Sequence, residues 1–130
     1  MFEPMDKSMP FDGPEKIDPK VLETFGYEYA EKDAEVEIST EEFTSVCPYS
    51  GLPDFGRLII VYVPDRKCIE LRSLKYYLLS YRSVGIFYEH LVNRVLDDLV
   101  AACQPKRMTV IGEFMPRGGI RTRVTAQYPR

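Results

Sequence analysis

The sequence has only one histidine and three cysteines, and the cysteines form no Cys-x-x-Cys pair. Such a set predicts neither a disulfide framework nor a zinc site, so we expect no metal. No apolar run approaches the roughly 20 residues needed to cross a bilayer. The beginning, "MFEPMDKSMPFDGPEK", is too acidic and too often interrupted by proline for a signal peptide. We therefore expect a cytoplasmic protein that does not enter a membrane.

Basic residues are not in excess either, since 17 lysines and arginines stand against 20 acidic residues, for a net charge of -3. Nucleic-acid-binding surfaces usually carry a clustered basic excess, so we expect no direct contact with nucleic acid. The 130 residues, 45% of them hydrophobic, suffice for one globular core. Four prolines among charges predict a mobile arm over residues 1–20, followed by a single domain over residues 21–130.

Two strand-like segments open that domain. Residues 34–46, "AEVEISTEEFTSV", alternate in part and are rich in β-branched residues, with Val36, Ile38, Thr40 and Glu42 on one side. After turn signals at residues 50–54, the run "GRLIIVYVP" predicts a more buried strand that ends at Pro64.

Two helices and two more strands follow. "SLKYYLLSYR" has the apolar spacing of one helical face, with Ser73 as a possible N-cap, and residues 85–103 predict a second helix that ends before Gln104-Pro105. "KRMTVIGEF" and "GIRTRVTAQY" are strand-like, joined by "MPRGG", whose glycines permit positive φ. The order ββααββ predicts an α+β domain, with a four-stranded antiparallel sheet and two helices on one face. Association of several copies would cover the other face.

Cys47 is the first candidate for chemistry, because it lies where a strand enters a loop containing Pro48, Gly51 and Pro53. A buried filler is the ordinary role of a lone cysteine, but this position favours a pocket-facing nucleophile. Cys68 and Cys103 have the contexts of structural residues. Asp54 is either a turn residue, the common use of Pro-Asp, or a proton donor near the thiol.

Glu89 and His90 lie at the start of the second predicted helix. Helical spacing puts Glu89 at the head of the apolar stripe of Val92, Leu96 and Leu99, which indicates either a carboxylate favoured by the helix dipole or a binding residue. His90, on the polar side, is expected to be a solvated surface residue.

The segment "ELRSLKYY", residues 70–77, places Arg72 and Lys75 at a helix start. A capped and solvated helix explains this pattern, and a phosphate held by the basic pair and the helix N-terminus also does. There is no Gly-x-Gly-x-x-Gly sequence, which argues against a Rossmann dinucleotide site.

Four segments, "FTSVCPYSGLPDFG", "CIELRSLKYYLLSYR", "FYEHLVNRVLDDL" and "PRGGI", resemble in order and spacing the short form of the NADPH-dependent 7-cyano-7-deazaguanine reductases. The resemblance runs from about residue 41 to residue 120. It implies the tunnelling fold, in which sheets join around a barrel-like ring, and a homo-oligomer of two stacked pentamers with sites at subunit interfaces.

The resemblance also implies roles for individual residues. Cys47 matches the nucleophile that adds to the nitrile as a thioimide, and Asp54 matches the proton donor. Two NADPH would then reduce the nitrile to an aminomethyl group, a step of queuosine tRNA-modification biosynthesis. The matching substrate-binding positions are Ile69, Glu70, Leu71, Tyr88 and Glu89, and the segment 70–76 matches the NADPH motif, with Arg72, Ser73 and Lys75 as cofactor-binding candidates.

Three further features refine this expectation. Tyr88 stands where the family often has histidine, and Arg72 where it commonly has lysine; each can still donate hydrogen bonds. Glu89 can accept the adjacent N–H donors of the purine-like ring as a pair. Arg117, beside the glycine turn, is a candidate for a cofactor phosphate.

Three alternatives remain at this point. A zinc-dependent cyclohydrolase of the same fold is disfavoured because no histidine lies near Cys47 or Cys68. An amidinotransferase relative would form the same thioimide but accept nitrogen instead of hydride, and the segment "ELRSLKYY" favours the reductase. A non-catalytic purine-binding scaffold would leave Cys47 idle, which trapping of a covalent adduct would contradict.

Overall fold

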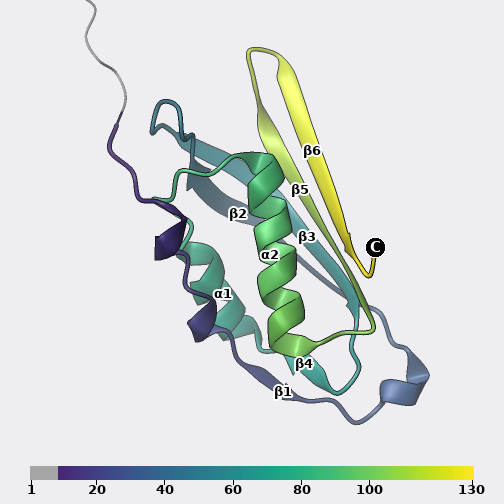
Figure 1. The fold of residues 1–130 in the computed structure, drawn as a ribbon. Coiled ribbons are helices and arrows are strands. Elements are labelled where there is room, and N and C mark those ends of the chain that lie inside the picture. Colours follow the sequence, from purple (N-terminus) through teal and green to yellow (C-terminus); the bar gives the residue numbers. More distant parts are fainter. Residues whose placement is uncertain (1–8) are drawn as a thin grey trace, which may run out of the picture.

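A four-stranded antiparallel sheet with two helices on one face forms the body of the computed structural model, which describes residues 9–130 (Figure 1). The strand order is β2-β3-β5-β6. The strands are β2 (Val36–Val46), β3 (Pro53–Val63), β5 (Arg107–Arg117) and β6 (Ile120–Tyr128), and the helices are α1 (Leu71–Leu79) and α2 (Tyr88–Cys103). This arrangement confirms the predicted α+β class and the order ββααββ.

A bulge in β2 changes which side chains face the helices. The pairing of β2 with β3 shifts between Thr40 and Phe43. The expected alternation therefore holds as far as Thr40, but Phe43 and Ser45 are buried while Glu42 is exposed. Glu42 lines the pocket between β2 and α1 with Ile38 and Thr40, on the side that the sequence predicted, but the extra residue of the bulge reverses the parity after it.

Strand β3 begins at Pro53, three residues earlier than the sequence predicted. Asp54 is consequently a strand residue, paired with Ser45 of β2, and not a turn residue. Its side chain is 5% exposed and faces the helix layer together with Leu58 and Ile60, since side chains alternate along a strand. The hairpin between β5 and β6 turns at Gly118 and Gly119, which both have positive φ as expected.

The helix boundaries differ from the expected ones at both N-termini. Glu70, not Ser73, caps α1: its carboxylate accepts the N–H groups of Arg72 and Ser73 at 2.8 Å each. The Ser73 hydroxyl instead donates to the Glu70 carbonyl at 2.8 Å. Helix α2 begins at Tyr88 and not at residue 85, because residues 84–86 bond to other backbone segments.

The core lies between the sheet and the two helices. It includes the α2 stripe of Val92, Leu96 and Leu99, as the sequence predicted. Tyr77 of α1 and Tyr81, which follows α1, form a polar network with α2, in which the Tyr77 hydroxyl donates to Asp98 at 2.6 Å and lies 2.7 Å from the Tyr81 hydroxyl. Among residues 9–130, no helix is long and apolar enough to cross a membrane.

The N-terminal part of the described chain packs on this body. Short 3-10 helices at Pro14–Lys16, Pro19–Val21 and Ala30–Lys32 and a small sheet of β1 (Thr24–Gly26) with β4 (Lys67–Ile69) extend it. Ile17 is only 4% exposed. Residues 13–20 thus pack on the body through an apolar residue among the prolines, while the predicted mobility of residues 1–20 stays a prediction; residues 1–8 lie outside the described residues.

Candidate active site

Cys47 lies at the first position after β2, in a tight loop that leads to β3. Its N–H donates to the Leu52 carbonyl at 2.9 Å, and its own carbonyl accepts the Gly51 N–H at 2.8 Å. These two bonds close the loop around the residue. The side chain is neither fully buried nor fully exposed, so the sulfur is within reach of a ligand.

The loop backbone favours the thiolate form of Cys47. Burial alone would raise the pKa of the thiol, but the N–H groups of Ser50 and Tyr49 and the Ser50 hydroxyl outweigh it and lower the pKa below its ordinary value. The Tyr49 N–H lies 3.4 Å from Sγ. Since the thiolate is the nucleophile, this loop prepares Cys47 for covalent chemistry.

Asp54 enters the same site from β3, and it is paired with Arg117 at the end of β5. Its Oδ1 lies 2.7 Å from an Arg117 nitrogen. The same nitrogen donates a hydrogen bond to the Pro53 carbonyl at 2.9 Å. Its contact with Asp54 is an ion pair and not an aligned hydrogen bond. The Arg117 cation thus faces a buried Asp54 carboxylate at this end of the fold, and the role of Asp54 as proton donor stays a prediction.

Tyr88, the first residue of α2, completes this group. Its ring stacks on Phe114 of β5, with centroids 3.9 Å apart and planes 7° from parallel. Burial, followed by hydrogen bonding to Asp54, raises the pKa of the Tyr88 hydroxyl to about 12. The hydroxyl is therefore a neutral donor near neutral pH, which an imidazole at this position would not always be.

Glu89 and His90 follow on the first turn of α2, and both are exposed. Glu89 therefore does not lie in the apolar stripe, because the helix face that meets the sheet begins at Leu91 and Val92. No side chain among residues 9–130 donates a hydrogen bond to its carboxylate, which leaves it able to accept N–H groups of a ligand. The expected solvated position of His90 is confirmed.

The remaining predicted residues gather elsewhere, at the start of α1. Ile69 is 3% exposed and Leu71 is 59% exposed. Hydrogen bonds from the N–H groups of Arg72 and Ser73 lower the pKa of Glu70. These amides are already occupied, so in this chain the helix N-terminus itself does not offer them to a phosphate.

Three predicted cofactor residues differ in accessibility. Arg72 and Lys75 are exposed, and neither forms an ion pair with an acid in the part of the chain that the structure describes. Ser73 is 4% exposed, and its hydroxyl also accepts the Glu23 N–H at 2.9 Å. The basic pair thus fits an anionic cofactor, whereas the Ser73 hydroxyl is committed to the fold.

The structure places these two groups at opposite ends of the molecule (Figure 1). The cysteine end comprises Cys47, Asp54, Tyr88, Glu89 and Arg117; the α1 end comprises residues 69–75. Tyr62 of β3 marks the α1 end, because its hydroxyl accepts the Ile69 N–H at 3.0 Å. From Asp54 to Tyr62, β3 spans about 26 Å at roughly 3.3 Å per residue. One chain alone therefore does not bring all the predicted site residues together.

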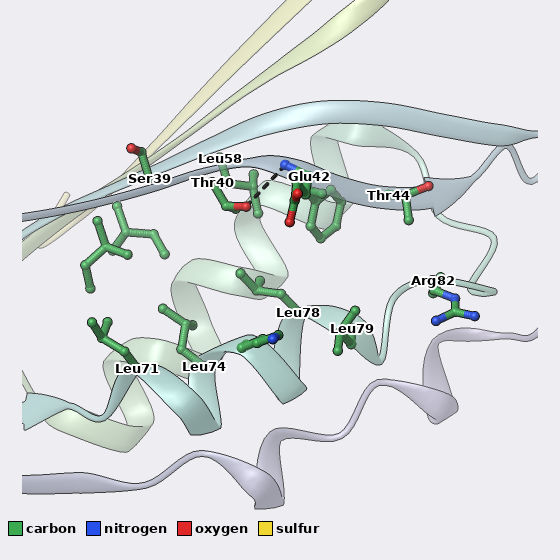
Figure 2. A pocket seen from close by; sticks show the side chains of 14 residues that line it. Ser39, Thr40, Glu42, Thr44, Leu58, Leu71, Leu74, Leu78, Leu79 and Arg82 are labelled. Atoms are coloured by element: carbon green, nitrogen blue, oxygen red, sulfur yellow. Dashed lines mark hydrogen bonds between the residues drawn. The ribbon is translucent and has the colours of Figure 1, made fainter.

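A pocket of about 420 Å³ lies between β2 and α1 (Figure 2). Leu74 and Leu78 line its helix side together with Leu71 and Lys75 of the α1 end, and Arg82 lies at one end of it. Neither Cys47 nor Asp54 lines this pocket. It runs along α1 and past its end, from Leu71 to Arg82, and offers apolar surface beside two cations, Lys75 and Arg82.

Several contributors to the site were missed by the sequence analysis. The N–H groups of Tyr49 and Ser50 have no side-chain signal, although the Ser50-Gly51 turn indicated a tight loop. For Phe114 the sequence indicated only a strand residue and gave no sign of a role in the site. Ser45 is fully buried opposite Asp54, and its hydroxyl has no partner in residues 9–130. No group of three His, Cys, Asp or Glu side chains within these residues could hold a metal ion.

A family model described as QueF-like protein matches residues 53–130. The chain belongs to the QueF-like family. NADPH-dependent 7-cyano-7-deazaguanine reductases of Caldicellulosiruptor bescii and Thermoanaerobacter pseudethanolicus are 61% and 59% identical to it over 118 residues, which cover 91% of this chain and 90% and 89% of theirs. The reductase of Chlorobaculum tepidum is 56% identical over 111 residues, or 85% of this chain and 95% of its own. The predicted resemblance is thereby confirmed.

A crystal structure of the archaeosine synthase QueF-Like in the apo form has the same fold as this QueF-like chain. Its TM-score is 0.67 at 27% sequence identity, and the match covers 72% of this chain and 91% of that one. The fold is therefore shared with a family member that carries a different enzyme name.

Proposed function

We propose that this chain reduces the nitrile of 7-cyano-7-deazaguanine to an aminomethyl group with NADPH, in queuosine biosynthesis. The observation that carries the proposal is the cysteine end, where a thiol with a lowered pKa lies in one site with a buried carboxylate. Curated relatives at 54–61% identity bear the name of this enzyme. The chemistry and the relatives support the same reaction.

In this reaction Cys47 acts as the nucleophile. Its thiolate adds to the nitrile carbon, so a carbon–sulfur bond forms and one carbon–nitrogen π bond breaks, while Asp54 provides the proton that the nitrogen takes up. Arg117 neutralises the Asp54 carboxylate that remains. The Tyr88 hydroxyl, which keeps its proton at neutral pH, orients that carboxylate.

Substrate and cofactor would be held by groups from both ends. Glu89, exposed beside Tyr88, accepts the paired N–H donors of the deazaguanine ring. Arg72 and Lys75 suit the phosphates of NADPH, since both are exposed cations of α1 and Lys75 lines the pocket between β2 and α1. When bound, NADPH would supply hydride, and a nitrile needs two hydrides to become an amine. The bond between the Cys47 sulfur and the substrate carbon must break between the two hydride additions, which returns the thiol and frees the product.

Because the two ends lie far apart in one chain, we further propose that the complete site forms between copies in a homo-oligomer. Within residues 9–130, no strand pairs with the outer edges of β2 and β6, and no helix covers the sheet face opposite α1 and α2. Edge pairing around a ring would use both features and bring the cysteine end of one copy near the α1 end of the next. Ten subunits and a cytoplasmic location remain predictions.

The test is NADPH consumption by the purified protein with 7-cyano-7-deazaguanine, followed by nicotinamide absorbance and by intact mass. We expect two NADPH per nitrile and a covalent adduct in the absence of NADPH. Cys47→Ala should lose both signals, whereas the matched variant Cys68→Ala should keep both, because Cys68 is buried at the other end of the fold. A covalent adduct without NADPH consumption would instead support the amidinotransferase. If both the adduct and the NADPH consumption are absent, the protein is a non-catalytic binding scaffold.

A further inference from the structure

The N-terminal clip, residues 9–12, lies directly against the cysteine end. The Met9 N–H donates to the Ser50 carbonyl at 2.7 Å, which ties the clip to the loop that follows Cys47. Three residues later, Asp12 donates its N–H to the Ser83 carbonyl at 2.7 Å and accepts the Gly85 N–H at 2.8 Å. The clip is thus attached at two places to segments that are far from it in sequence.

The second attachment also leads to Cys47. Residues 83–86 lie between the clip and the end of β2: the Val46 N–H donates to the Val84 carbonyl at 3.0 Å, and the Ile86 N–H donates to the Val46 carbonyl at 3.2 Å. Val46 immediately precedes Cys47, and Ile86 leads into α2 and Tyr88. Three backbone segments are therefore bonded side by side across the base of the site.

The clip approaches both segments so closely that only glycine fits opposite it. Gly51 has a φ of 73°, and a Cβ there would collide with the Met9 carbonyl oxygen. A Cβ at Gly85 would collide with the Phe11 ring. Pro10, between these contacts, restricts the backbone further. The loop and the clip are thus shaped to each other and do not merely touch.

The hydrogen bond from Met9 is made to Ser50, whose backbone N–H contributes most to lowering the pKa of Cys47. Ser50 supplies an N–H and a hydroxyl that favour the Cys47 thiolate, and its carbonyl is the acceptor for Met9. A loop that is held at Ser50 keeps these donors directed at Sγ, whereas a loose loop would lose part of their effect. The clip therefore sets the geometry on which the thiolate depends.

We propose that the clip is a positioning element of the active site, in which the Met9 N–H holds the Cys47 loop through Ser50 and Asp12 holds the end of β2 through residues 83–86. The inference rests on the proposed function only in that Cys47 is the nucleophile. Other groups that face Cys47 are Asp54 from β3 and Tyr88 from α2, with Arg117 of β5 paired to Asp54. Asp54, Tyr88 and Arg117 lie outside the clip, so a substitution of Met9 does not remove any of these groups.

The test compares Met9→Pro, which removes the N–H donor, with Met9→Ala, which keeps it. Alkylation of Cys47 by iodoacetamide is followed by intact mass across a pH series. The alkylation rate rises as pH increases through the thiol pKa, so a higher pKa moves this rise to higher pH. We expect Met9→Pro to alkylate roughly 3- to 10-fold more slowly than wild type at neutral pH, as a pKa higher by up to about one unit requires. Met9→Ala should match wild type.

Gly51→Ala strains the loop directly, because alanine rarely adopts a φ of 73°, and it serves as a positive control for a distorted Cys47 loop. An unchanged profile in Met9→Pro, with the thermal unfolding midpoint as a check on folding, would overturn the proposal. A shifted alkylation profile in a protein that fails to reduce the nitrile would support the clip while the proposed function fails, so the two failures are distinguishable.

Discussion

The three cysteines show how strongly a side chain's chemistry depends on its surroundings. Burial raises the pKa of Cys68 above its ordinary value and that of Cys103 to about 11, whereas loop amides lower the pKa of Cys47 despite burial. Near neutral pH only Cys47 therefore gains thiolate character. The sequence context of Cys47, a strand end followed by a proline- and glycine-containing loop, predicted the same choice for a related reason, because loops supply free N–H groups.

Arg117 is the second residue whose role depends on its contacts. The structure engages it with Asp54 and the Pro53 carbonyl, which favours a role on the proton donor over the predicted role on a cofactor phosphate. We expect Arg117→Ala to lower kcat about tenfold, with the Michaelis constant for NADPH unchanged, because an interaction with a reacting group affects the chemical step. The variant should also lose about 1–2 kcal/mol of unfolding free energy, since a buried carboxylate loses its cation.

The matched control is Arg121→Ala, an exposed arginine of the same hairpin that forms no ion pair within residues 9–130. It should leave kcat, the Michaelis constant and the unfolding free energy unchanged. If Arg117→Ala raises the Michaelis constant for NADPH and leaves kcat normal, Arg117 binds the cofactor phosphate and does not act on Asp54.

At the scale of elements, α1 and α2 are joined by a polar network as well as by apolar packing. Tyr77 donates to Asp98, which also accepts from Arg94 at 2.8 Å, so one carboxylate links both helices. The helical spacing of the sequence predicted that Tyr77 and Tyr81 share a face with Leu74. It did not predict that their hydroxyls meet a carboxylate, because that requires the position of α2.

Tyr77→Phe removes one donor from this network while it keeps the ring in the core. We expect a loss of about 1–2 kcal/mol of unfolding free energy, because the half-buried Asp98 carboxylate loses a hydrogen bond. Tyr76→Phe is the matched control, since Tyr76 is 58% exposed on the same helix, and it should unfold like wild type in urea. Equal midpoints for the two variants would show that the network contributes no stability.

For the whole molecule, the separation of the cysteine end from the α1 end is the main consequence of the fold. The reductases of Thermoanaerobacter pseudethanolicus and Caldicellulosiruptor bescii match over 91% of the chain, which includes both ends of the site. The free edges of β2 and β6 offer pairing surfaces to further copies. A shared site therefore follows from the proposed activity together with the shape of one chain.

Complementation tests this shared site. Cys47→Ala damages the cysteine end, and Arg72→Glu reverses an exposed cation at the α1 end; each variant alone should be nearly inactive. Mixed, dissociated and reassembled together, they should recover about a quarter of wild-type activity, because that fraction of sites between copies combines two intact halves. A mixture that stays inactive, while two differently tagged wild-type preparations exchange subunits, would place the whole site within one chain.

The sequence by itself determined the elements, the class and the family. Apolar patterns are local, so the unbroken apolar run in residues 58–63 and the apolar spacing of α1 and α2 carry their own signal. Four segments in order and spacing, from the Cys47 loop to "PRGGI", indicated the family. The residues expected to act as nucleophile and proton donor were also named correctly as neighbours, since Cys47 and Asp54 are linked by a short loop.

Tertiary structure decided the features that depend on contacts between distant segments. The β2 bulge reversed the side chain parity before Cys47, Glu70 replaced Ser73 as the cap of α1, and residues 9–20 packed on the domain. It also separated residues 69–75 from the cysteine end. Hydrogen-bonding groups and apolar surface in these segments are satisfied by partners many residues away, and a local pattern holds no information on which distant partner is available.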